Sequence, residues 1–168
     1  MFSENLNKLK KKMSENNIDL SIITDDDSIY YFTGYHDFLH MDFYRPTLLV
    51  VSNDHKTYLI TPLLDVLLVP ESCPVDMVET WNDGIGNEWR ELLPHIINQH
   101  KNIFIEKFKI NSMVKSYLDE ILPQQPGDLT NLIDSIRMIK SNHELNIARH
   151  AGEVGMAMME AAKKTIGN

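Results

Sequence analysis

Residues 46–61, PTLLVVSNDHKTYLIT, carry the pattern that decides the fold. Pro46–Val51 is almost continuously apolar, which is typical of a strand in the middle of a sheet. Asn53-Asp54 predicts a tight turn, and Lys56–Thr61 predicts a strand that returns beside the first. The stretch therefore predicts a central β-hairpin.

The segments on either side of this hairpin alternate between helical and extended patterns. Leu6, Leu9 and Met13 recur at helical spacing and predict a helix over residues 3–16, and Ile18–Ile23 alternates as a strand. The further predicted helices cover Ile29–Phe32, Pro62–Leu68, 87–99 and Ser112–Leu122, and the further predicted strands cover Pro74–Thr80 and Asn102–Glu106. Gly34 should end the first of these helices, and Trp89 should lie in the core. Val75, Met77 and Val78 should face inward. This order predicts an α/β fold, a three-layer domain in which helices flank a mixed central β-sheet.

The last forty residues differ in character. Ser141 and Glu144 match a capping box, and an apolar stripe rich in alanine and methionine follows on one helical face for about 22 residues. The sequence thus predicts a domain over 1–128, and a linker with one long C-terminal helix over 129–168. Because such a stripe needs a surface to pack on, we expect the chain to be the first part of a longer protein.

Composition excludes several classes of function. The 168 residues carry a formal net charge of −8, which argues against nucleic acid as a partner because phosphate binding needs a basic surface. No apolar stretch approaches the roughly 18 residues that a membrane helix needs, and the N-terminus has no apolar signal core, so we expect a cytoplasmic protein without a membrane partner. Cys73 is the only cysteine, so no intrachain disulfide forms, and no neighbouring base or cation marks it as a nucleophile.

Two segments resemble a known family. Ile29-Tyr30-Tyr31-Phe32-Thr33-Gly34-Tyr35, after the strand that ends at Ile23, is similar to the turn that opens the N-terminal domain of the creatinase/prolidase/aminopeptidase P family. About 110 residues later, Arg137-Met138-Ile139-Lys140-Ser141, followed by Glu144-Leu145, closely resembles the linker of that family. The resemblance covers essentially the whole chain and implies a ribonuclease H-like fold.

The resemblance also implies a function. In this family the domain is non-catalytic and precedes a pita-bread catalytic domain, whose first helix would be the long C-terminal one here. The parent protein would be an Xaa-Pro dipeptidase or aminopeptidase, a hydrolase with two divalent metal ions (of the Mn, Co or Zn type) held by two Asp, one His and two Glu of the catalytic domain. None of those ligand positions lies in this chain, so we expect it to be inactive alone and to hold no cofactor. Its expected partners are its own catalytic domain, the second subunit of a homodimer, and a peptide or small amide substrate.

The segment from Tyr35 to Arg45 is the candidate site, because the resemblance implies that loops of this domain close over the active site of the partner subunit. Phe43-Tyr44-Arg45 is similar to the Phe-x-Arg of creatinase, in which the arginine pairs with a substrate carboxylate and the aromatic ring walls off an apolar or cationic group. His36, His40 and Trp81 are further candidates. Roles without any contact to substrate stay open for each candidate. The arginine can form a surface ion pair with Asp37 or Asp42, Phe43 and Trp81 can pack in the core, and both histidines can be solvated loop residues.

Two groups of possible metal ligands, one of histidines and one of aspartates, do not predict a metal site. His36 and His40 are four residues apart but in a loop, without a helical frame, and Asp25-Asp26-Asp27 are consecutive, so their side chains diverge and suit caps and turns. We expect no metal in this chain.

Two rival functions remain open at this point: the N-terminal domain of a creatinase-like, metal-independent C–N hydrolase, and a stand-alone dimerisation or interaction module. The apolar stripe also predicts that the isolated chain dimerises or swaps through residues 141–166.

Overall fold

The computed structural model describes residues 1–36, 45–54, 56–82 and 89–166. The chain divides into two compact units, Met1–Ile136 and Arg137–Asn168. Among the residues so described, no helix is both long and apolar enough to cross a membrane.

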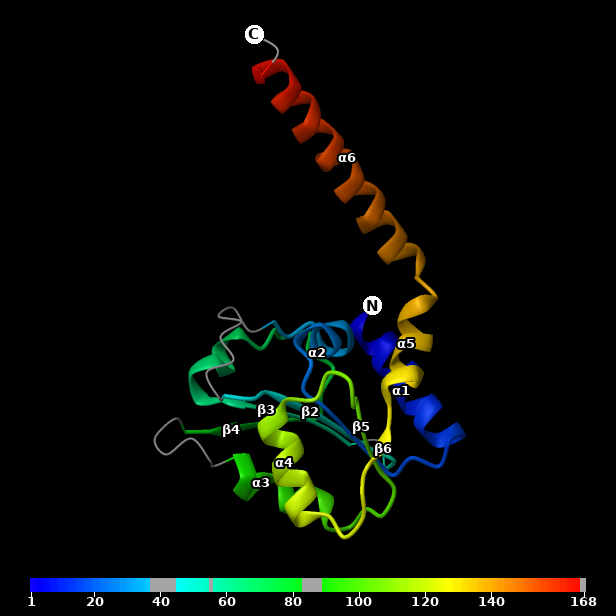
Figure 1. Cartoon of the computed structure of the whole chain (residues 1–168), viewed down its shortest axis with the longest axis vertical. Helices are drawn as coiled ribbons and strands as arrows, with labels where there is room; N and C mark the ends of the chain where they lie inside the picture. The colour runs from blue at the N-terminus through cyan, green and yellow to red at the C-terminus, as the bar shows by residue number, and fades with distance from the viewer. Residues whose placement is uncertain (37–44, 55, 83–88, 167–168) are drawn as a thin grey trace. The chain divides into compact units, whose positions relative to one another are not determined.

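A six-stranded mixed sheet forms the middle of the first unit (Figure 1). Its strands are β1 (Leu20–Ile23), β2 (Leu48–Ser52), β3 (Thr57–Pro62), β4 (Met77–Trp81), β5 (Ile103–Ile105) and β6 (Gly127–Asp128), in the spatial order β4-β3-β2-β1-β5-β6. β2 pairs antiparallel with both β1 and β3, whereas β3–β4, β1–β5 and β5–β6 are parallel. The predicted hairpin is therefore confirmed as β2–β3, and the mixed sheet is confirmed with it.

Helices cover both faces of the sheet, which confirms the three-layer prediction. They are α1 (Phe2–Glu15), α2 (Asp26–Thr33), the 3₁₀ helix η1 (Leu63–Leu68), α3 (Trp89–Ile97), α4 (Ser112–Ile121) and α5 (Thr130–Met138). α1, α2 and α5 pack their apolar residues into one core, and α3 and α4 pack theirs into the other. Successive residues of β1 and β2 enter opposite cores, as the period of two in a strand requires: Ile22 and Val50 face α3 and α4, and Ile23 and Val51 face the other side. Trp89 is completely buried, as predicted.

Asp25 and Gly34 fix the two ends of α2. The Asp25 carboxylate accepts a hydrogen bond from the Ser28 backbone N–H at 3.0 Å and so caps α2. Gly34 ends the helix in the left-handed region with φ 76°, where a side chain is strained, and a Cβ there would lie 2.6 Å from the Phe2 ring. α2 is longer than the predicted Ile29–Phe32, because the helix begins directly after its cap.

One prediction about the sheet edges is wrong, and one edge strand was missed. Met77 and Val78 do not face inward: their side chains are 45% and 39% exposed, because β4 is an edge strand and packs inward mainly through Trp81. Val75, before the strand, is half-buried against the core on the α1 side. β6 was not predicted, since two residues, Gly127 and Asp128, are too few to give a period.

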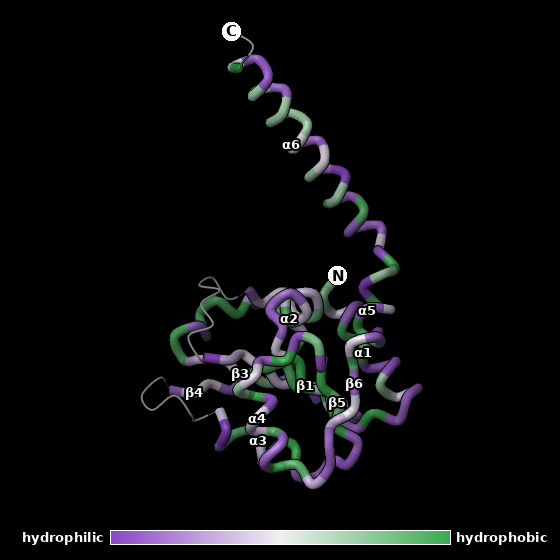
Figure 2. The backbone as a smooth tube through the Cα atoms, in the orientation of Figure 1, coloured by the Kyte–Doolittle hydropathy of each residue, from purple (hydrophilic) through white to green (hydrophobic). Residues whose placement is uncertain are grey.

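The second unit contains α6 (Asn142–Ile166), and no residue of this helix is buried. Its capping box is confirmed: the Ser141 backbone N–H and hydroxyl both donate to Glu144 Oε2 at 2.7 Å, and the Glu144 N–H donates back to Ser141 Oγ at 3.3 Å. Hydrophobic and hydrophilic residues alternate along the helix (Figure 2).

Candidate functional site

The structure places three of the five candidate residues, whereas His40 and Phe43 lie outside the described residues. His36 follows α2 with its side chain exposed, and its ring meets the Tyr30 ring edge-on at a centroid distance of 5.8 Å. Arg45 is half-buried three residues before β2 begins. Arg45 therefore lies where β2 begins and β3 ends, and the contact between Tyr35 and Thr61 brings His36 to the same end of these strands.

A buried network of three hydroxyl groups fixes this edge. The Tyr35 and Thr61 hydroxyls lie 2.9 Å apart, and those of Thr47 and Thr61 lie 3.2 Å apart. All three side chains are buried, so these hydrogen bonds satisfy groups that would otherwise be costly to desolvate. The network joins the residue before His36 to the residue two after Arg45, and it therefore holds both candidates against the end of β3.

Sequence reasoning missed this network. The available signals were Thr47, a hydroxyl in the apolar run Pro46–Val51, and Thr61, at the end of the return strand Lys56–Thr61. A hydroxyl at such a position satisfies its hydrogen bond most readily with another hydroxyl from a neighbouring segment. Tyr35 precedes both threonines in the sequence, and no local pattern indicates its contact with Thr61.

Trp81 ends β4, beside Pro62 in the parallel pairing with β3. Its side chain is 2% exposed and packs in the core under α3 and α4. The indole Nε1 is buried without a hydrogen-bond acceptor in the part of the chain that the structure describes. The ring thus packs in the core, and a role of Trp81 toward a substrate stays a prediction.

A second polar group lies where β1 and β5 end. Glu106 is fully buried; its Oε1 accepts a hydrogen bond from the Ser28 hydroxyl at 3.1 Å and lies 3.7 Å from the Lys109 ammonium. That ammonium is also 3.1 Å from the Asp25 carboxylate. These ion pairs tie the start of α2 to the end of β5. The Lys109 ammonium balances the charge of both carboxylates, so a bound metal cation is not needed to do so, and we assign the group a structural role.

The described residues form no cluster of metal ligands, and their one cysteine is not activated. No three His, Cys, Asp or Glu side chains of the described residues come together so that they could hold a metal ion. Partial burial raises the pKa of the Cys73 thiol, which keeps it protonated and unreactive at neutral pH.

One comparison with known proteins shows the family of this chain, and another shows its fold. The family model described as the creatinase/prolidase N-terminal domain matches residues 5–139. Among solved structures, a proline dipeptidase from Streptococcus pneumoniae TIGR4 is 22% identical with a TM-score of 0.68, and the alignment covers 80% of this chain and 98% of that one. A dipeptidase from Pyrococcus horikoshii OT3 is 22% identical with a TM-score of 0.78, covering 94% of this chain and 43% of that one. An Xaa-Pro dipeptidase from Bacillus anthracis is 16% identical with a TM-score of 0.76, covering 96% and 42%.

At these identities the structural likeness shows the fold alone. This chain spans nearly all of the first structure and less than half of the other two. A search of the curated proteins found no match.

Proposed function

Since the chain belongs to the creatinase/prolidase N-terminal domain family, we propose that it is the non-catalytic domain of an Xaa-Pro dipeptidase or aminopeptidase. The observation that carries this proposal is the match of the family model over residues 5–139, supported by a shared fold with chains named as Xaa-Pro and proline dipeptidases. The hydrolytic chemistry would belong to a catalytic domain that follows this one. The two divalent metal ions of that domain would activate a water molecule for attack on the scissile amide.

In this proposal the domain contributes to dimerisation and helps to cover the active site of the partner subunit. Arg45 would bind the carboxylate of the substrate, because a guanidinium offers two parallel N–H donors to the two carboxylate oxygens. The hydroxyl network of Tyr35, Thr47 and Thr61 supports this role, since it fixes the backbone on which Arg45 and His36 stand. A residue that is held in place before binding loses less conformational entropy when the ligand arrives.

The test begins with the coding sequence beyond Asn168 and the protein that it encodes. We expect the full-length protein to hydrolyse Xaa-Pro dipeptides with added Mn²⁺ or Co²⁺, and residues 1–168 alone to be inactive. Hydrolysis by residues 1–168, or a full-length protein without a catalytic domain, would contradict the proposal. Metal-independent cleavage of a C–N bond in a guanidino substrate would favour the creatinase-like alternative instead.

The role of Arg45 has its own test in the full-length protein. Arg45→Ala should raise the KM for the dipeptide about ten-fold or more, because a charge-assisted hydrogen bond contributes roughly 1.5–3 kcal/mol. Lys56→Ala is the matched control, since Lys56 is an exposed cation just before β3 begins, whereas Arg45 lies near the end of β3. Equal KM values for the Arg45 and Lys56 variants would remove Arg45 from the substrate site.

A further inference from the structure

We draw no further inference here: the strongest candidate, the exposed apolar surface patch that the 3₁₀ helix η1 and the edge strand β4 form through Leu63, Leu64, Leu67, Leu68, Met77 and Val78, carries none, because nothing in the structure shows what covers it.

Discussion

The first unit and α6 use the same kind of sequence pattern with different results. α1, α3 and α4 each bury the apolar residues of one face against the sheet, whereas α6, with 25 residues and a comparable stripe, buries none. An amphipathic period therefore suffices to predict a helix. Whether the apolar face is buried depends on whether another element of the chain packs against it. The first unit is stabilised by two cores, and α6 by its cap and by contacts within the helix.

The tryptophans make this comparison measurable. Trp81 and Trp89 are the two tryptophans of the chain, and both lie in the core of the first unit. Tryptophan fluorescence during urea unfolding therefore reports on that unit, and far-UV circular dichroism reports on both units together. Each prediction below compares a change in the first unit with a matched change in α6.

The largest expected effect is a cavity in the first unit. Phe32→Ala should lower the free energy of unfolding by about 3–5 kcal/mol, because the Phe32 side chain is completely buried between α2 and the sheet. Met158→Ala in α6 removes a side chain that is 68% exposed and should leave the fluorescence transition unchanged. A shift of that transition by the Met158 variant would show that α6 stabilises the first unit.

Removal of the helix caps should have a smaller effect. Asp25→Ala removes the cap of α2 and the ion pair with Lys109, and should cost about 1 kcal/mol or slightly more in the fluorescence transition. Ser141→Ala should reduce the helical signal in circular dichroism and leave that transition in place, since its hydrogen bonds stabilise α6 alone. Equal shifts from both variants would contradict the separation of the two units.

Replacing glycine by alanine should change stability in opposite directions in the two units. Nothing lies within 4 Å of a Cβ added at Gly152 or Gly155, so Gly152→Ala and Gly155→Ala should each stabilise α6 by about 0.5–1 kcal/mol and raise its helical signal. Gly34→Ala should instead destabilise the first unit, because its φ is 76° and the new Cβ would meet the Phe2 ring. A stable Gly34→Ala protein would show that Phe2 moves away at little cost.

The smallest expected effect is in acid. The N–H of Asn102 lowers the pKa of Asp19 in the folded chain, so the charged carboxylate favours folding. That contribution is fully present above the unfolded value of about 4 and is lost as the pH falls through the lower, folded value. Asp19→Asn should therefore flatten the loss of stability below about pH 4, whereas Glu160→Gln in α6 should not change it. Parallel acid transitions for Asp19→Asn and the unsubstituted chain would contradict this assignment.

Sequence patterns predicted elements of both units wherever one local rule applied. The hairpin strands, the stop at Gly34 and the capping box at Ser141 each follow from a few adjacent residues. The errors fall where position in the sheet decides: Met77 and Val78 look like core residues, but a strand at the edge lacks a neighbour to cover them. Local sequence does not state which strand is at the edge.

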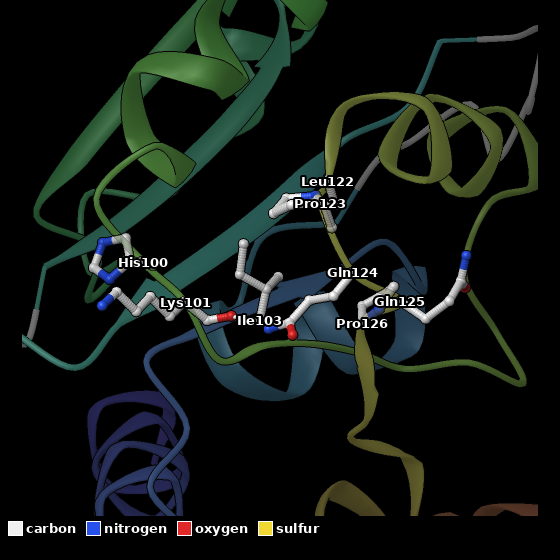
Figure 3. Close-up of a pocket in the computed structure, with 8 residues that line it drawn as sticks. All are labelled: His100, Lys101, Ile103, Leu122, Pro123, Gln124, Gln125 and Pro126. Atoms are coloured by element: carbon white, nitrogen blue, oxygen red, sulfur yellow. Dashed lines mark hydrogen bonds between the residues drawn. The ribbon is translucent and has the colours of Figure 1, made fainter.

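The candidate site was predicted less completely than the fold. His36 and Arg45 are predicted from residue type and resemblance, and the hydrogen bonds of Tyr35 and Thr47 to Thr61 hold their neighbours in the chain at the end of β3. The hydroxyl network that supports them joins residues 26 and 14 positions apart, which sequence spacing does not reveal. A cavity of about 270 Å³ beside Lys101, between the loops that precede β5 and β6 (Figure 3), is also invisible in the sequence, because its walls come from loops joined only through the tertiary fold.

The strand order has a consequence for synthesis on the ribosome. β1 acquires one neighbour as soon as residues 48–52 emerge, but its other neighbour, β5, is made about 80 residues after β1 itself. At about 5–20 residues per second, the nascent chain holds that side of β1 open for roughly 4–16 s. Asn102, whose backbone carbonyl accepts the N–H groups of Asp19 and Leu20 on this side, is translated at the end of that interval. β1, which lies inside the finished sheet, is therefore an edge strand while the chain is being made. During this interval its unpaired backbone groups can pair with another chain.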